Sequence, residues 1–249
     1  MFDYEDPTSL SQLYHLNSEP WQNNEAYESA GYEVEYKEIK EGADEIELGA
    51  PPTDPLLNTI RQRSSCRQFQ SQFLLPRDVF SLLLTGMYGI IRTDYSLLNG
   101  FPLWLRAVPS AGGLYPLEIN VLTQRVSGIS DGLHHYNVRR HSLEPLDPRA
   151  TFAQFEPLLF NFPFIENANA LFLISAVFRR TQKKYGPRGY RYVLLEAGHA
   201  AQNLCLLAAE QGLGSLCMGG YPDARLNAAL KLETPEEGIV YSVAVGLPA

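Results

Sequence analysis

The stretch from Tyr190 to Gly212 constrains the fold of this chain more than any other part of the sequence. Apolar residues recur in it at helical spacing, and many of them are alanines: Ala197, Ala200, Ala201 and Ala208. Because alanine has a short side chain, the pattern predicts a long helix against which another backbone packs closely. Gly212 and Gly214 supply its end.

A continuous apolar run from Ala168 to Phe178 is the second strong signal. An uninterrupted run of this kind, rather than an alternating one, indicates a strand buried on both faces. Weaker patterns predict helices near residues 54–60, 79–87 and 223–230, strands at 117–126, 134–138 and 239–245, and a turn-rich stretch that ends at Gly113. Helices and strands do not alternate regularly, which favours an α+β fold over a doubly wound sheet.

Length and composition indicate a chain that folds without disulfides or structural metal. With 249 residues, 45% of them hydrophobic, it should bury roughly three quarters of the surface that its unfolded form exposes. Three widely spaced cysteines, Cys66, Cys205 and Cys217, form no C-x-x-C pair, and we expect all three to be reduced. The first ten residues carry acids where a signal peptide carries lysine or arginine, so we expect a cytoplasmic protein.

The net charge of −8 is concentrated at the amino-terminal end. Residues 1–50 hold thirteen acidic residues against two lysines. We expect them to form an acidic, aromatic-containing segment packed on one body formed by residues 51–249; a docking surface for a basic partner is the alternative. No stripe of lysine and arginine follows, so nucleic acid is not expected as a partner.

The sequence lacks the motifs of several common functions, namely nucleotide binding, metal binding and serine hydrolysis. No Walker A sequence occurs, and Gly212 and Gly214 follow a helix instead of opening one, so they are not a dinucleotide fingerprint. His134, His135 and His141 have no carboxylate or cysteine at ligand spacing, so no metal site is expected. Ser110 lies outside the G-x-S-x-G frame of a hydrolase nucleophile.

Two segments in the first half of the chain could bind a cofactor. The segment Arg63-Ser-Ser-Cys-Arg67 places two guanidinium groups and two hydroxyls directly after a predicted helix, a combination that can hold a phosphate. The segment Pro109-Ser-Ala-Gly-Gly-Leu-Tyr-Pro116 is rich in small residues, which let backbone amides approach a flat ligand. Taken alone, the first could equally be a solvated turn and the second an ordinary one.

Two segments in the second half add candidates for chemistry. Residues 183–192 form a basic and aromatic stretch that we expect to be a loop between the buried strand and the long helix. A lysine beside a tyrosine there, Lys184 and Tyr185, could supply a base and a hydrogen-bonding acid. Residues 214–221 end a short strand with Gly219 and Gly220, a backbone suited to close packing on a ring.

The order and spacing of these segments resemble a known family. Arg63-Ser-Ser-Cys-Arg-Gln-Phe69, Pro109-Ser-Ala-Gly-Gly-Leu-Tyr-Pro-Leu-Glu118, Lys184-Tyr-Gly-Pro-Arg-Gly-Tyr-Arg-Tyr192 and Leu195-Glu-Ala-Gly-His-Ala-Ala-Gln-Asn-Leu204 are similar to segments of the SagB-type dehydrogenases of the nitroreductase-like superfamily. Tyr14-His-Leu and the stretch from Tyr36 to Leu48 also resemble that family, so the likeness covers nearly the whole chain.

The resemblance implies an α+β fold with a central, mainly antiparallel sheet flanked by helices, and a homodimer with FMN at the subunit interface. In that homodimer we expect the alanine surface of the long helix to form a contact between the two copies. It assigns the flavin phosphate and ribityl chain to Arg63, Ser65 and Arg67, with Ser64 in the same stretch. Further residues would line the flavin: Pro109, Ser110, Ala111, Gly113, Cys217, Met218, Gly219 and Gly220.

The family's chemistry is the oxidation of thiazoline or oxazoline rings in a peptide to thiazole or oxazole, with dioxygen reoxidising the flavin. Lys184 and Tyr185 match its lysine–tyrosine pair, and a YcaO-type cyclodehydratase would be a partner. Two alternatives stay open: an NAD(P)H-dependent nitroreductase or quinone reductase, and a flavin-poor scaffold subunit of a heterocycle-forming complex.

The chain departs from the family pattern at two positions. Ser64 stands where the family more often has arginine, and the sequence around residues 245–249, Val-Gly-Leu-Pro-Ala, lacks a basic residue that many members of the superfamily use for the phosphate. Both departures predict a weaker hold on the phosphate.

Overall fold

A computed structural model describes Leu13, Tyr14, Ser18 and residues 46–96, 100, 102–160 and 162–249. Most of the predicted acidic segment, residues 1–50, therefore lies outside the described residues. Within the described ones, the ring of Tyr14 packs edge-on against that of Tyr190, with 5.6 Å between the ring centroids. The packing of residues 1–50 on the body stays a prediction.

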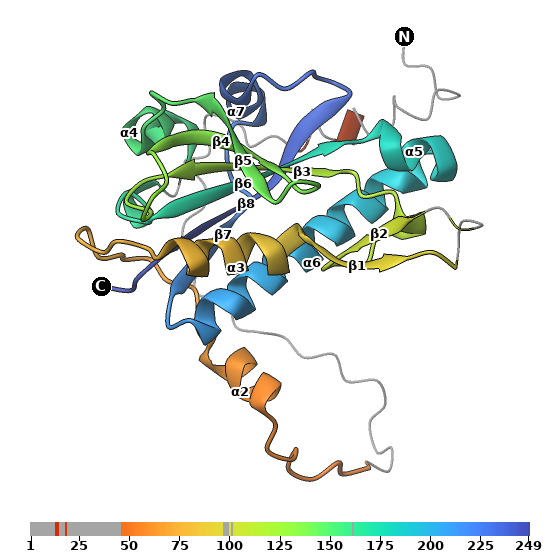
Figure 1. The fold of residues 1–249 in the computed structure, drawn as a ribbon, viewed down its shortest axis with the longest axis horizontal. Helices are drawn as coiled ribbons and strands as arrows, with labels where there is room; N and C mark the ends of the chain where they lie inside the picture. The colour runs from red at the N-terminus through yellow and green to blue at the C-terminus, as the bar shows by residue number, and fades with distance from the viewer. Residues whose placement is uncertain (1–12, 15–17, 19–45, 97–99, 101, 161) are drawn as a thin grey trace, which may run out of the picture.

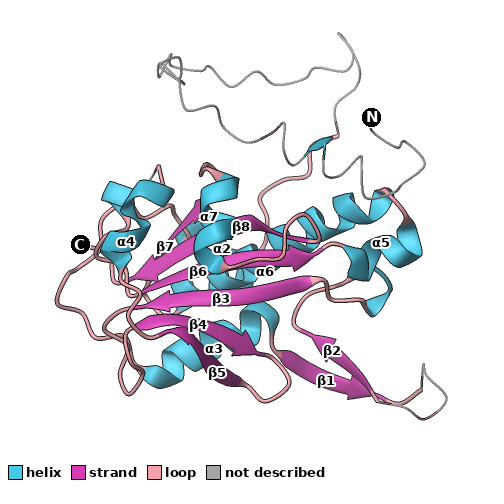
Figure 2. Cartoon of the chain, turned by 90° about the horizontal axis from the view of Figure 1, so that it is seen from above, coloured by secondary structure: helices cyan, strands magenta, loops and turns pink. Residues whose placement is uncertain are grey.

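The centre of the fold is a six-stranded sheet in which every pair of neighbouring strands is antiparallel. The order across it is β5-β4-β3-β6-β8-β7 (Figure 2). The strands are β3 (Leu117–Thr123), β4 (Gly132–Asn137), β5 (Ser142–Asp147), β6 (Ala170–Val177), β7 (Gly214–Met218) and β8 (Glu237–Gly246). The fold is thus α+β with a central antiparallel sheet, as the sequence predicts.

Helices cover both faces of the sheet (Figure 1). On one face lie α3 (Arg77–Tyr88) and α6 (Arg188–Glu210), and on the other α4 (Phe152–Phe155) and α7 (Asp223–Leu230). Strand β6 runs between the two layers: Phe172 and Ile174 enter the core on the α6 side, while Leu171 and Leu173 enter the core on the α7 side. This double burial is why the apolar run of β6 is continuous instead of alternating.

Helix α6 buries its alanines inside its own chain. Ala197, Ala200, Ala201 and Ala208 are at most 2% exposed and belong to the core between α6, α3 and the sheet. Their short side chains allow the close approach that the sequence predicts. Our expectation that this surface forms a contact between two copies is wrong, because the chain's own sheet and helix α3 already occupy it.

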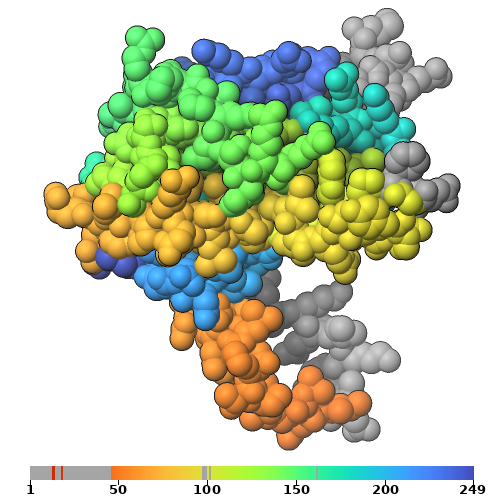
Figure 3. Space-filling model, in the orientation of Figure 1, coloured from red at the N-terminus to blue at the C-terminus, as the bar shows by residue number. Residues whose placement is uncertain are grey.

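Helix α2 (Pro55–Gln62) starts as its sequence predicts, since the Asp54 side chain accepts a hydrogen bond of 3.0 Å from the Leu57 amide. Figure 3 shows this helix and the residues before it, in orange, standing out from the body. Its apolar residues Leu56 and Ile60 are 60% and 44% exposed. No helix among the described residues is long and apolar enough to cross a membrane.

The structure corrects the expected loop at residues 183–192. Lys184 and Tyr185 end helix α5 (Arg179–Tyr185), and Arg188 already begins α6. The two helices meet at Gly186, whose φ of 56° suits glycine, and Pro187, which has no amide hydrogen to lose. The sequence concealed α5 because this helix is only seven residues long and mostly polar.

The structure adds three details to the elements predicted from the sequence. The stretch before Gly113 contains a two-stranded hairpin, β1 (Ile90–Asp94) and β2 (Leu103–Arg106), rather than turns alone. Strand β5 carries too few apolar residues to be recognised. Asp223 is the first residue of α7, and the preceding Pro222 holds the cap position.

The contact between α5 and α6 yields a test. A methyl group at Gly189 would lie 2.9 Å from both the amide nitrogen and the Cα of Gln182, so the α5 backbone would have to move. We expect Gly189→Ala to lower the free energy of unfolding by about 1–3 kcal/mol in urea titrations. Gly198→Ala is the matched control on the same helix: nothing lies within 4 Å, and the change should stabilise the chain by up to about 1 kcal/mol. Equal stability of the two variants would contradict this packing.

Candidate functional site

The segment of residues 63–67 lies beside the edge strand β7. Ser65 forms a parallel bridge with Ser215, and the Cys66 amide donates a hydrogen bond of 2.9 Å to the Ser215 carbonyl. Ser64, Ser65 and Arg67 are exposed, and Arg63 is half-buried. The hydroxyl and guanidinium groups of this stretch are therefore available to an anion.

The Arg63 guanidinium also acts on the cysteine of β7. Its positive charge helps to lower the pKa of Cys217, and it acts on Cys205 as well. The structure thus brings together two segments that the sequence separates by about 150 residues, the stretch after α2 and the end of β7.

The residues at the end of β7 leave room for a ligand at the backbone. A Cβ on Gly219 would have only Tyr241 Cε2 at 4.0 Å, and one on Gly220 only Phe160 Cδ2 at 3.7 Å. Cys217 is exposed, whereas the Met218 side chain is 2% exposed in the core on the α7 side. Met218 can therefore face a cofactor only through its backbone.

The segment of residues 109–113 meets the end of α5. Ala111, Gly112 and Gly113 form one 3₁₀ turn, in which Gly112 has a φ of 65°. A Cβ built on Gly112 would lie 2.8 Å from both Lys184 Nζ and Tyr185 Oη. The lysine–tyrosine pair and the small-residue segment, predicted separately from the sequence, are thus direct neighbours in space.

The Lys184–Tyr185 pair is packed on aromatic rings. Lys184 Nζ lies 5.3 Å from the centroid of the Tyr185 ring, and that ring meets Tyr192 edge-on at 5.0 Å. Lys184 and Lys183 are exposed, and Tyr185 is half-buried. A substrate that approaches Gly112 would meet the amine and the phenol together.

A buried carboxyl group holds the small-residue segment from below. Glu196 of α6 is 2% exposed, accepts a hydrogen bond of 2.7 Å from the Tyr88 hydroxyl, and is hydrogen-bonded to the Ser110 side chain. Ser110 Oγ also accepts the Tyr115 amide at 2.9 Å. Burial raises the pKa of Glu196, although these hydrogen bonds and the charge of Arg106 oppose that rise.

Arg106 completes this cluster. Its guanidinium carbon lies 4.4 Å from the ring centroid of Tyr88 and 4.8 Å from that of Tyr115. The Tyr88 hydroxyl accepts the Leu117 amide at 3.1 Å. Burial, followed by the neighbouring Glu196, raises the pKa of Tyr88 well above its ordinary value, so this hydroxyl stays a donor.

A second charged cluster fixes helix α5. Arg180 forms an ion pair with Glu118 at the start of β3 and donates a hydrogen bond of 3.3 Å to the Tyr115 carbonyl. His135 Nε2 lies 2.8 Å from the same Glu118 carboxylate. Because Arg180 stands one helical turn before Lys184, this cluster sets the position of the lysine.

The charges of the second cluster shift one another's pKa values. Burial raises the pKa of Glu118, but the hydrogen bond from His135 and the charge of Arg180 outweigh it, so the pKa is lowered overall. The hydrogen bond to Glu118 is the main reason that the pKa of His135 is raised, against the effect of burial. The folded chain therefore favours the imidazolium form of His135.

Glu196 and Cys205 mark two separate parts of the site along α6. Ser110 and the Lys184–Tyr185 pair lie at the first part, and Arg63 and Cys217 at the second. Cys205 stands nine positions after Glu196, which corresponds to a rise of about 13.5 Å along the helix axis. Within one chain the predicted site residues therefore form two groups instead of one.

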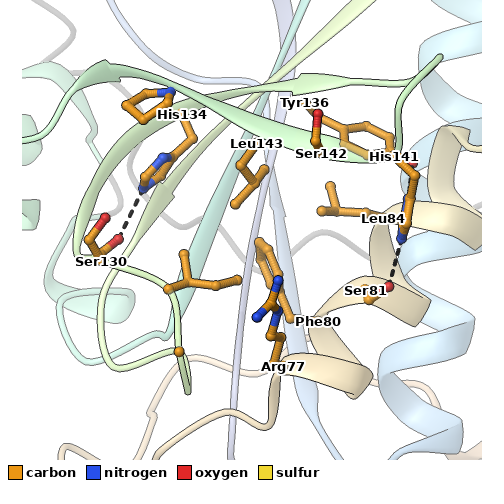
Figure 4. Close-up of a pocket in the computed structure, with 13 residues that line it drawn as sticks. Arg77, Phe80, Ser81, Leu84, Ser130, His134, Tyr136, His141, Ser142 and Leu143 are labelled. Carbon is orange, nitrogen blue, oxygen red and sulfur yellow. Dashed lines mark hydrogen bonds between the residues drawn. The ribbon is translucent and has the colours of Figure 1, made fainter.

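A cavity of about 430 Å³ lies elsewhere, between α3 and the outer strands β4 and β5 (Figure 4). It contains no residue of the four motifs. Two histidines of the sequence analysis line it: His134 Nε2 contacts the Ser130 carbonyl at 3.0 Å, and His141 Nε2 contacts Ser81 Oγ at 2.7 Å. Among the described residues, no group of three or more His, Cys, Asp or Glu side chains could hold a metal ion.

Sequence reasoning missed the residues that position the site: Tyr88, Arg106, Glu118, His135, Arg180 and Glu196. One signal could have found two of them. Glu196 stands on the alanine-rich inner face of a helix, and Glu118 is the second residue of a mostly apolar strand. A carboxylate in such a place needs a partner when it is buried.

Comparison with known proteins identifies the family. Residues 60–247 match the Nitroreductase family, so the chain belongs to it, and this family consists of oxidoreductases. The chain is 34% identical over 192 residues to MJ1384, a candidate nitroreductase of Methanocaldococcus jannaschii, with 76% of this chain and 92% of that protein covered.

Two further relatives are named as processing proteins. The chain is 30% identical over 169 residues to the trifolitoxin-processing protein TfxB of Rhizobium leguminosarum and 28% identical over 133 residues to the microcin B17-processing protein McbC of Escherichia coli. The matches cover 64% and 51% of this chain, but only 44% and 49% of those relatives.

Solved structures share the fold. A candidate nitroreductase of Ralstonia eutropha has a TM-score of 0.60 at 25% identity, covering 82% of this chain and 88% of its own. A chain of the E. coli microcin synthetase complex McbBCD, with truncated pro-MccB17 bound, has a TM-score of 0.68 at 19% identity. The match covers 98% of this chain and 94% of that one. A candidate nitroreductase of Desulfovibrio desulfuricans in complex with FMN has a TM-score of 0.54 at 20% identity. The match covers 80% of this chain and 88% of that one.

The charged cluster around His135 predicts a pH dependence of stability. A raised pKa in the folded state means that His135 contributes its full stabilisation below its unfolded pKa of about 6.5 and loses it as the pH rises through the higher folded value. In wild type, unfolding midpoints should therefore fall over this window, and His135→Asn should flatten that part of the curve. His199→Asn, an exposed histidine on α6, is the control and should keep the wild-type slope. The same slope in all three proteins would contradict the assignment.

Proposed function

We propose that this chain is an FMN-dependent dehydrogenase of the SagB type, which oxidises thiazoline or oxazoline rings in a peptide to thiazole or oxazole. The observation that carries the proposal is the contact of Lys184 and Tyr185 with Gly112, since it joins a proton-transfer pair to a segment suited to a flat ligand. The similarity to TfxB and McbC, both named for the processing of peptides, supports a peptide as substrate.

The residues around β7 fit FMN. Arg63, Ser64, Ser65 and Arg67 offer charged and hydroxyl donors of the kind that bind a phosphate. Gly219 and Gly220 leave open the space that a Cβ would fill, so a ring can lie against this backbone. In the proposed site these residues hold FMN together with Cys217 and the backbone of Met218, while Pro109, Ser110, Ala111 and Gly113 line the ring.

The chemistry follows from the residues near Gly112. In its neutral form the Lys184 amine takes a proton from the azoline ring carbon next to the carbonyl, and the Tyr185 hydroxyl orients that amine or stabilises developing charge. Bound FMN supplies the acceptor for the hydrogen that leaves with its electron pair, and dioxygen reoxidises it. Loss of both hydrogens makes the ring aromatic, which drives the reaction forward.

Two copies of the chain would complete the site. The two groups of site residues meet α6 at Glu196 and at Cys205, positions that differ by a helix rise of about 13.5 Å, which suits a flavin at an interface to which both subunits contribute. Helix α2 projects from the body with Leu56 and Ile60 exposed, and Leu195 of α6 is 54% exposed. These apolar residues, rather than the alanines of α6, are the surface we propose for the homodimer.

A cyclodehydratase is the proposed partner that supplies the azoline. The fold matches a chain of the McbBCD complex, which has a peptide bound. A YcaO-type cyclodehydratase would produce the ring that this chain oxidises. The rival function, an NAD(P)H-dependent nitroreductase, is supported by the similarity to MJ1384. Bleaching of the purified flavin by NADH within the time of turnover would favour that rival.

The phosphate assignment can be tested by flavin titration. Replacing Arg63 with alanine removes a charge-assisted hydrogen bond, so FMN binding should weaken by about 1.5–3 kcal/mol. Arg61→Ala is the matched control, because Arg61 is an exposed arginine on the last turn of α2, two residues before Arg63. If both variants bind FMN as tightly as wild type does, the phosphate lies elsewhere.

The azoline chemistry can be tested at Lys184. Lys184→Ala should leave FMN bound but slow ring oxidation by about 10²- to 10⁴-fold, the contribution of a positioned general base. Mass spectrometry of an azoline peptide would follow the loss of two hydrogens per ring. Tyr185→Phe should cost less if the hydroxyl only orients the amine.

The adjacent lysine is the control for this test. Lys183 is also exposed, and the three atoms nearest to a Cβ built on Gly112 belong to Lys184 and Tyr185, so Lys183→Ala should retain the wild-type rate. Equal turnover of wild type and Lys184→Ala would show that the base lies elsewhere. An absence of azoline oxidation in all variants, with NADH-driven turnover intact, would favour the nitroreductase instead.

A further inference from the structure

Two cysteines outside the proton-transfer pair lie in contact. Cys205 Sγ of α6 and Cys217 Sγ of β7 are 3.4 Å apart. Cys205 is 3% exposed, whereas Cys217 is exposed at the surface of the edge strand. Cys217 thus stands at the surface of the chain, and the sulfur of the buried Cys205 is in contact with its sulfur.

The surroundings of Cys217 favour its thiolate. The hydrogen bond from Cys205 is the main influence, and with help from Tyr241 and Arg63 it outweighs burial and lowers the pKa of Cys217 to about 6. The hydrogen bond to Cys217, together with burial, raises the pKa of Cys205 instead. At neutral pH the pair is therefore one nucleophilic thiolate with one neutral thiol donating to it.

We propose that Cys205 and Cys217 form a reversible, peroxide-sensitive dithiol site, in which Cys217 is the sulfur that is attacked first and Cys205 is the sulfur that resolves it. The site goes beyond the proposed ring oxidation. Because the proposed function places Cys217 beside FMN, the dithiol site is assigned to the flavin-free chain. A hydroperoxide from any source is the oxidant, and a soluble thiol is the reductant.

The two steps balance as follows. The Cys217 thiolate attacks hydrogen peroxide, the O–O bond breaks, and a sulfenic acid and hydroxide form; the sulfur loses two electrons, which the peroxide gains. The Cys205 sulfur then attacks that of Cys217, the S–O bond breaks, and the departing hydroxide leaves with the Cys205 proton as water. A disulfide closes between α6 and β7.

The positions of the two sulfurs favour this bond. The sulfurs are already in contact, and a disulfide needs them to approach to about 2.05 Å. Strand β7 is at the edge of the sheet and pairs with β8, so it can adjust more easily than a central strand. Cys66 is not placed for the same reaction, because its thiol donates to the Gln68 carbonyl at 3.1 Å.

Peroxide titration of the purified, flavin-free chain tests the proposal. One equivalent of hydrogen peroxide at pH 7 should reduce the number of titratable thiols in the unfolded protein from three to one. The mass should fall by two hydrogen atoms, and peptide mapping should link Cys205 to Cys217. Dithiothreitol should restore all three thiols.

Variants separate the roles of the two sulfurs. In Cys205→Ser, Cys217 should stop at a sulfenic acid that dimedone traps, or gain two oxygen atoms, with no linked peptide. In Cys217→Ser, Cys66 and Cys205 should both stay reduced. Cys66→Ser is the matched control and should form the same disulfide as wild type.

The pH dependence of the rate provides a second, independent measurement. A thiolate with a pKa of about 6 should react about tenfold more slowly at pH 5 than at pH 7, since only the thiolate attacks peroxide. Three results would overturn the proposal: three intact thiols after peroxide, a disulfide that contains Cys66, or addition of two oxygen atoms to Cys217 in wild type while Cys205 stays a thiol.

Discussion

The close packing of α6 beneath the sheet determines where the rest of the site can lie. Alanines at the buried positions of this helix let its backbone approach α3 and the strands directly. The helix can then neither slide nor rotate without losing contacts along its whole length. Glu196 and Cys205, both pointing from its buried face, are therefore fixed points: one supports Ser110, and the other contacts Cys217.

The sequence alone was sufficient to predict the elements whose hydrophobic pattern follows from their own burial. The alanine stripe of α6 and the continuous apolar run of β6 were both predicted to within a few residues. The run of β6 also indicated burial on both faces, whereas the alanine stripe did not show that it packs inside its own chain instead of against a second copy. The site pairings were harder to predict because they join residues far apart. Neither Glu118 and Arg180 nor Cys205 and Cys217 show any local sign of their contact. The short helix α5 was missed because its stability comes from such contacts rather than from an apolar face.

Burial of the Glu196 carboxyl group lowers the stability of the core but supports the site. A carboxyl group at 2% exposure costs free energy through lost hydration, and the hydrogen bonds from Tyr88 and Ser110 offset this cost only in part, as its raised pKa shows. An apolar residue there would suit the core better but would leave the Tyr88 and Ser110 hydroxyls without their partner. We infer that the carboxyl group serves to hold the Ser110 turn rather than to stabilise the core.

The position of the Lys184–Tyr185 pair is fixed by the contacts of helix α5. Arg180, one turn earlier on α5, ties the helix to Glu118, and Gly186 and Pro187 turn the chain directly into α6. Tyr192 then returns to pack on the Tyr185 ring. Since successive helix residues point about 100° apart, Lys183 cannot share the direction of Lys184. The backbone of α5 thus selects one of two adjacent lysines, and the ion pair with Glu118 determines where that lysine stands relative to Gly112.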